Sequence, residues 1–309
     1  MIEPLPDVGR RRKRWIDTFA ATIVTIGAIA YLLDLLVVRW GLDQTYIASS
    51  YPKYLRAAWT SVYVTTISYF LGMSIGLVFG WARSVRAPPL TKVIATQRRA
   101  MVAAADGGTP RGWLTGTILF FAVKRYIRRG ADAYVAIIRG TPLFVQIVFV
   151  WSAVIVYYPH WDFQVQGLVA GIVALTANTG AYQSEIFRAG ILTVHSGQVE
   201  AGRAIGLTRW GAMRYVVLPQ ALRLVIPPLT NEYIGLLKAS SLLAVIGVLE
   251  LTTFGRREAF TNFRIFEAFA LVTGIYLLIT VPVSKLIEWV ERRYRTPGLG
   301  FQQTRTARV

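Results

Sequence analysis

Apolar residues in this chain occur in runs of about twenty positions rather than in stripes that repeat every three or four residues. Runs of that length match the hydrocarbon thickness of a bilayer, so they predict membrane-spanning helices. The predicted spans are residues 19–38, 57–81, 142–158, 167–187, 224–249 and 265–286. The pattern therefore predicts an all-α polytopic membrane protein with about six transmembrane helices.

Composition and charge support this class. Of the 309 residues, 54% are hydrophobic and 16% are charged, against about 25% charged in soluble domains. The net charge of +18 is compatible with nucleic acid, anionic lipid or cytoplasmic loops. With the N-terminus placed in the cytoplasm, 27 Lys and Arg fall on the inner side and six on the outer side. Most of the positive charge is therefore explained by the orientation of the loops in the membrane, and nucleic acid binding is a poor explanation for it.

The same layout divides the chain into three parts. Residues 1–56 hold a basic cytoplasmic N-terminus, an extra transmembrane helix and an outer loop, residues 57–290 a transmembrane domain, and residues 291–309 a basic cytoplasmic tail. Within the domain, residues 87–130 form a basic cytoplasmic excursion. Residues 113–129 join apolar and basic positions as an interfacial helix on anionic headgroups does. The alternative for residues 87–111 is a solvated linker.

Two local signals concern helix contacts and helix starts. Gly72, Gly76 and Gly80 place small residues on one face of a span, where another helix approaches closely. That stripe fits either a moving or dimerising contact or ordinary packing inside one subunit.

Thr141 suits an N-cap and Pro142 suits the first helical position of the span that follows.

Charged and polar residues inside the spans suggest a pathway. Lys238 falls near the centre of residues 224–249, where a charge costs about 2.5–3.5 kcal/mol on insertion scales. Helical spacing places Asn231, Gly235, Lys238 and Ser241 on one face. We expect these side chains, with Glu232, to contribute to a substrate path. The alternative is a structural ion pair of Lys238 with Glu232, Glu250 or Glu185.

Glu185 has a local alternative of its own. It lies three residues before Arg188, so a structural pair between the two is favoured over a ligand-binding role.

Residues 197–211 form the most unusual loop. Residues 199–205 predict a short helix, Gly206 a C-terminal stop and Thr208 a cap for the next helix. Such a helix, held outside the membrane, is suited to docking, with Ile205, Leu207 and Trp210 available to fill a groove on a partner.

This loop resembles the cytoplasmic-loop signature of permease subunits of bacterial ATP-binding-cassette (ABC) importers. The matching positions are Glu200, Ala201, Gly206, Leu218 and Pro219; Gly202 and Val216 depart from the signature. Residues 139–143, 185–191 and 231–242 resemble the polar amino acid uptake branch in particular. Several separated motifs in one order make the resemblance specific. It covers residues 59–289 and leaves the extra N-terminal helix and the excursion without a family-based role.

The resemblance implies a type I ABC-importer permease core of five helices plus one extra N-terminal helix, in the bacterial inner membrane with both termini cytoplasmic. It implies three protein partners: an ATPase subunit, an extracytoplasmic amino acid-binding protein and a second permease subunit, identical or related. ATP and magnesium belong to the ATPase subunit, and no cofactor or metal is expected in this chain. The residues that would couple to the ATPase are Glu200, Ala201, Gly202, Ile205, Gly206 and Leu207.

Other classes fit less well. The chain has no G-x-x-x-x-G-K-[ST] phosphate loop, so it cannot supply an ATP site of that form, and in an ABC importer the energy must come from another polypeptide. A secondary amino acid transporter driven by an ion gradient is the main alternative, with Lys238 and a nearby carboxylate as charge carriers, although no inverted repeat is evident. A membrane hydrolase lacks a recognisable nucleophile and base, since there is no Cys and only two His.

Overall fold

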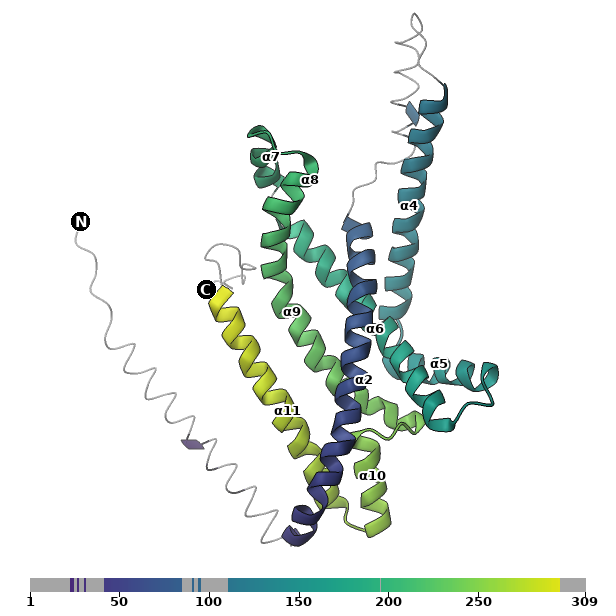
Figure 1. Ribbon diagram of the computed structural model, residues 1–309, viewed down its shortest axis with the longest axis vertical. Coiled ribbons are helices and arrows are strands. Elements are labelled where there is room, and N and C mark those ends of the chain that lie inside the picture. Colours follow the sequence, from purple (N-terminus) through teal and green to yellow (C-terminus); the bar gives the residue numbers. More distant parts are fainter. Residues whose placement is uncertain are drawn as a thin grey trace, which may run out of the picture.

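Every regular element that the structure describes is a helix. Figure 1 shows the computed structural model, which describes residues 42–84, 111–194 and 196–294 and a few isolated positions besides. The helices are α2 (Gln44–Ser84), α4 (Arg111–Arg139), α5 (Leu143–Tyr157), α6 (Phe163–Thr193), α7 (Ser196–Ala204), α8 (Arg209–Ala212), the π-helix η2 (Met213–Val217), α9 (Leu218–Ala239), the 3-10 helix η3 (Ser240–Ile246), α10 (Leu251–Asn262) and α11 (Ile265–Tyr294). The predicted all-α class is confirmed. The predicted first span, residues 19–38, lies almost entirely outside the described residues.

Fewer of the described helices meet the length and composition of a membrane span than the sequence pattern predicts, and α6 (Phe163–Thr193), which holds the predicted span at residues 167–187, is not among them. By length and composition, only α2 and residues 265–286 of α11 are long and apolar enough to span alone. Two bent pairs raise the number to four: residues 119–139 with α5, bent by 105°, and residues 210–246 with α10, bent by 50°. The predicted span at residues 142–158 is thus a 15-residue helix, about 22 Å long, that follows a sharp corner.

The corner between α4 and α5 corrects the predicted helix start. Pro142, with φ −64° and ψ 137°, is the residue that precedes α5, and Thr141 is not its cap. The Thr141 hydroxyl instead donates to the carbonyl of Ile137 at 3.0 Å, so it closes the end of α4. The Thr141 side chain therefore caps the C-terminal end of α4 rather than the N-terminal end of α5.

The predicted continuous span at residues 224–249 is wrong in its second half. The α-helix ends at Ala239 and continues as η3, after which Gly247 turns the chain with φ +73°. The Ser240 hydroxyl donates to the carbonyl of Leu237 at 2.7 Å within this tightened turn. Apolar composition alone does not reveal such a break, because the hydrophobic run continues through residues 242–249 on its far side.

Helix α2 starts earlier than predicted, since residues 44–56 are helical rather than an outer loop. Tyr54 and Ala58 pack there against Leu251 of α10 and Ala268 and Val272 of α11. These tertiary contacts stabilise a helical turn that contains Pro52 and carries no strong sequence signal of its own.

Helix α4 extends ten residues beyond the predicted amphipathic helix 113–129. Ala131 and Val135 are buried, and the Tyr134 hydroxyl donates to the carbonyl of Ala177 in α6 at 2.5 Å. Figure 1 shows α4 running beside α2, so its second half belongs to the bundle. The cytoplasmic excursion and its contact with headgroups remain predictions.

The glycine stripe of α2 packs inside the subunit, against α6. A Cβ added to Gly76 would lie 2.7 Å from the Gln183 Cβ and 3.0 Å from the Ser184 backbone nitrogen. Gly72 and Gly80 face α6 in the same way. Of the two interpretations of the stripe, packing within one chain is therefore the one that the structure supports.

Replacing Gly76 with Val should destabilise the bundle, because backbone atoms of α6 cannot move aside as a flexible side chain would. We expect a loss of about 1–3 kcal/mol or more in the free energy of unfolding, measured by thermal unfolding in detergent. Gly274→Val in α11 is the matched control, since nothing lies within 4 Å of an added Cβ there. Equal changes in the unfolding midpoint would contradict this packing.

The fully buried carboxylate of Glu250 joins α2, α10 and α11, where the Tyr276 hydroxyl donates to it at 3.4 Å. Glu250 caps α10 by accepting from the backbone nitrogens of Thr252 at 2.8 Å and Thr253 at 2.7 Å. The Ser61 hydroxyl of α2 also donates to it, at 3.2 Å. Asp162 caps α6 with two comparable bonds, but it is exposed to solvent.

The two caps allow a direct comparison. Asp162→Ala should cost about 1 kcal/mol of stability, as cap removal commonly does. Glu250→Ala should cost a further 1–3 kcal/mol or so, because it leaves buried donors of Ser61 and Thr253 unpaired. Thermal unfolding of the two variants side by side measures the difference, and equal losses would mean that water replaces the Glu250 carboxylate.

Candidate functional site

The loop that follows α6 has the predicted local structure. Helix α7 ends before Gly206, which has φ +94°, and the Leu207 nitrogen bonds to the carbonyl of Gly202 at 3.1 Å. This left-handed position favours glycine, so the predicted stop is confirmed. The Thr208 hydroxyl accepts from the Gly211 nitrogen at 3.0 Å, which confirms the predicted cap of α8.

The loop presents part of its predicted docking surface to solvent. Ile205 is 83% exposed and Trp210 is 72% exposed, and Glu200 and Ala201 are exposed beside them. Leu207 is half-buried and instead packs inside the loop.

Gly202 explains the inward position of Leu207. An added Cβ at Gly202 would lie 3.3 Å from the Cδ1 of Leu207 and 3.4 Å from the Cγ2 of Val216. The smallest residue therefore accommodates Leu207, at one of the positions where the sequence departs from the family signature.

The loop is rooted in the bundle by an apolar cluster. Val194 at the end of α6, Val217 of η2 and Ala221 of α9 are buried together, with Val199 of α7 packed against them. The cluster therefore packs α7 against the end of α6 and the start of α9.

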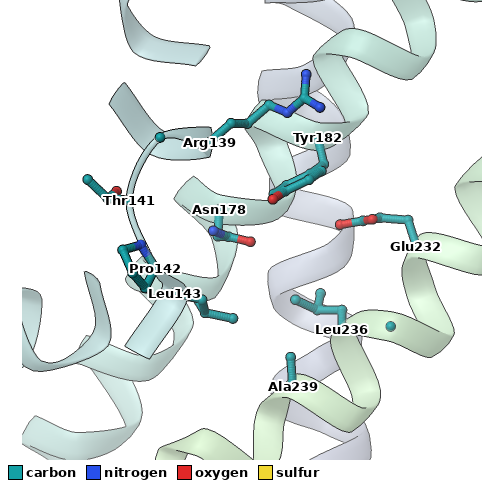
Figure 2. Close-up of a pocket in the computed structure, with 11 residues that line it drawn as sticks. Arg139, Thr141, Pro142, Leu143, Asn178, Tyr182, Glu232, Leu236 and Ala239 are labelled. Carbon is teal, nitrogen blue, oxygen red and sulfur yellow. The ribbon is translucent and has the colours of Figure 1, made fainter. Parts of the chain in front are cut away.

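A cavity of about 540 Å³ opens between α4, α5, α6 and α9 (Figure 2). Arg139, at the end of α4, and Tyr182 of α6 lie at one end of the cavity, and Ala239 of α9 lies at the other. Asn178 of α6 and Glu232 of α9 line the space between them. The cavity therefore depends on the α4–α5 corner meeting α6 and α9, which lie far from it in sequence.

Two opposite charges face this cavity. The guanidinium carbon of Arg139 lies 5.1 Å from the ring centre of Tyr182, in the range of a cation–π contact. The Glu232 carboxylate accepts from the Thr179 hydroxyl at 3.2 Å, and no ion pair joins it to Arg139. A cation and an anion that form no direct ion pair with each other can bind a carboxylate and an ammonium group of one ligand.

The wall of the cavity is held rigidly by two amides. The Asn178 amide donates to the Gln146 side-chain oxygen at 3.0 Å. The Gln146 amide nitrogen in turn donates to the Ile138 carbonyl at 2.7 Å and to the Thr141 hydroxyl at 2.8 Å. These bonds fix the α4–α5 corner, which carries Arg139, to α6.

Sequence reasoning identified only some of the residues that line the cavity. Glu232 and Gly235 line it, whereas Asn231 and Lys238 are exposed on α9 outside the lining set, and Ser241 is half-buried in η3. Arg139 belongs to the motif at residues 139–143, and the sequence alone gives it no further role. A cation directly before a Gly-Thr-Pro corner was the available signal, but nothing local shows what the corner faces.

Lys238 has no ion pair within the described part of the chain. The three candidate carboxylates have other partners: Glu232 contacts Thr179, Glu250 caps α10, and Glu185 contacts arginines. The structural pairing that was the alternative for Lys238 is therefore not found in this chain.

Glu185 belongs to an ion-pair cluster across three helices. The predicted pair with Arg188 is present. Arg83 of α2 also binds Glu185, at 2.8 Å, and Asp132 of α4, at 2.7 Å. Sequence reasoning missed these long-range pairs, because only the spacing of Glu185 and Arg188 is local.

The helical architecture, the rooted loop and the charged cavity define a membrane subunit of a transport system. Residues 108–296 match the family described as binding-protein-dependent transport system inner membrane component. The chain is 32% identical over 253 residues to the glutamine transport system permease protein GlnP of Escherichia coli strain K12, covering 82% of this chain and 98% of that protein. It is 39% identical over 163 residues to the probable glutamine ABC transporter permease protein GlnM of Bacillus subtilis, covering 52% of this chain and 73% of that one.

Solved structures agree with this assignment. The crystal structure of an amino acid ABC transporter with histidines aligns with a TM-score of 0.64 and 28% identity, covering 82% of this chain and 99% of that one. The MetNI methionine ABC transporter in inward-facing conformations aligns with a TM-score of 0.52 and 22% identity over 76% and 95% of the two chains, which supports the fold. The chain belongs to the binding-protein-dependent transport family, as an ABC importer permease of the polar amino acid branch.

Proposed function

We propose that this chain is the permease subunit of an ATP-driven importer of polar amino acids and that its 197–211 loop couples it to a separate ATPase subunit. The observation that carries the proposal is the α7–α8 loop, which projects from one end of the bundle in Figure 1 and exposes Ile205 and Trp210. Two large apolar side chains in solvent are suited to a groove on a partner protein.

The coupling set comprises Glu200, Ala201, Gly202, Ile205, Gly206 and Leu207. Within it, Ile205 and Glu200 contact the ATPase directly, whereas Gly202 and Leu207 hold the shape of the loop and Gly206 ends α7. Closure of the ATPase pushes α7, and the apolar cluster around Val194 passes the movement to α6 and α9. The helices then rock between outward and inward openings.

The cavity supports an amino acid as the cargo. Arg139 would bind the α-carboxylate of the amino acid and Glu232 its α-ammonium group. Asn178, in the wall of the cavity, provides a polar contact for the side chain of the substrate. A volume of about 540 Å³ is ample for one amino acid and lies within the range of small-molecule sites. The exposed α9 residues Asn231 and Lys238, with the half-buried Ser241 of η3, extend the pathway beyond the cavity.

The remaining partners follow from the same role. An extracytoplasmic amino acid-binding protein delivers the substrate, and a second permease subunit, identical or related, completes the pathway against the exposed α9 face. The coupling loop and both termini lie in the cytoplasm, where the ATPase holds ATP and magnesium.

Gly206→Val should uncouple transport from ATP hydrolysis. An L-residue in the left-handed region costs about 1–2 kcal/mol, so the end of α7 should shift. We expect normal abundance in the membrane, retained ATPase activity and at least about a tenfold fall in amino acid uptake per ATP hydrolysed in proteoliposomes. Gly197→Val is the matched control, because that glycine has open space around it and no positive φ. Full coupled transport in Gly206→Val would count against the coupling role.

Arg139→Gln and Glu232→Gln should each weaken substrate use. Hydrogen bonds to charged groups contribute about 1.5–3 kcal/mol, so kcat/KM for uptake should fall by about 10- to 150-fold.

Lys238→Met tests the α9 face separately: altered uptake kinetics would support its place in the pathway, and unchanged kinetics at normal abundance would remove it. Uptake that persists without ATP and collapses with the ion gradient would contradict the proposal as a whole.

A further inference from the structure

Two cavities follow one another along α6 and α9. Besides the cavity of Figure 2, a second one of about 280 Å³ is lined by Glu185, Ala189 and Thr193 of α6 and by Leu224 and Pro228 of α9. Both cavities share two residues, Arg139 and Tyr182.

The order of the lining residues places the second cavity on the side of the coupling loop. Along α6 the lining moves from Asn178 to Ala189, toward α7, which is an advance of about 16 Å. Along α9, which runs the other way, it moves from Glu232 back to Leu224. Both helices therefore give the same order, with Arg139 and Tyr182 at the junction.

We propose that the contact between Arg139 and Tyr182 is a gate between the two cavities, through which a zwitterionic amino acid passes toward the coupling loop. This inference rests on the proposed function and assigns a position within that pathway. The two residues come from different elements, the end of α4 and the middle of α6, so relative movement of those helices opens or closes the contact.

The chemistry of the contact suits a gate that the substrate itself can open. The Arg139 guanidinium has no carboxylate ion pair in the described chain, since Glu185 is taken by Arg83 and Arg188. Tyr182 offers only the face of its ring, a weaker partner for a guanidinium than a carboxylate. A substrate carboxylate in the first cavity therefore competes with the ring for Arg139 and releases it.

The chain provides a favourable background for testing this gate, because it contains no cysteine. A single Cys replaces Ala239, which lines the first cavity, or Ala189, which lines the second. The assembled transporter is placed in inside-out membrane vesicles without nucleotide. A membrane-impermeant, positively charged methanethiosulfonate reagent is added, and modification of this chain is followed by mass spectrometry.

With Tyr182 in place, Cys at 239 should react slowly and Cys at 189 rapidly. Tyr182→Ala should raise the rate at position 239 by about tenfold, whereas Tyr182→Phe, which keeps the ring, should leave it slow. The rate at position 189 should stay within about twofold in all variants, because that cavity lies before the gate. Equal rates at position 239 with and without the ring, or a parallel rise at both positions, would overturn the proposal.

Arg139→Gln supplies a second route to the same result. It removes the cation from the other side of the contact, so it should also raise the rate at position 239, even if Tyr182→Ala assembles poorly. The labelling requires no substrate. Failure to transport amino acids would therefore refute the proposed cargo and leave the gate standing, whereas unchanged labelling in an active importer would refute the gate alone.

Discussion

The close approach of α2 and α6 is the contact on which the other features of the bundle depend. Gly72, Gly76 and Gly80 bring the two backbones so near that a single Cβ would strike atoms of α6. In a bilayer, where apolar side chains gain little by leaving lipid, such van der Waals contact is a principal source of helix association. With α6 fixed on α2, every residue that α6 carries has a defined place.

What α6 carries is the link between the cavity and the loop. Asn178 and Tyr182 face the cavity, Glu185 joins the ion-pair cluster with Arg83, and Val194 anchors the coupling loop. These features follow one another along a single stiff helix. In the proposed function, a push on α7 reaches the cavity through this one helix and its apolar anchor.

The cavity itself depends on the sharp corner between α4 and α5. Without the turn at residues 140–142, Arg139 would continue into a straight helix instead of facing Glu232 across the cavity. The Gln146 amide secures that corner by bonding to Ile138 and Thr141 and by holding Asn178. For the proposed amino acid site, these amides mean that little rearrangement is needed before a ligand is received.

The sequence by itself determined the membrane class, the family, the stop at Gly206, the cap at Thr208 and the pair of Glu185 with Arg188. Each depends on composition, on an ordered set of motifs or on residues within one helical turn. Only the tertiary structure decided the partner of the glycine stripe, the break of α9 at Ser240, the position of Thr141 and the meeting of Arg139, Asn178 and Glu232. These depend on contacts between residues tens of positions apart, and a local pattern of hydrophobicity or helix propensity carries no information about which distant surface a side chain will meet.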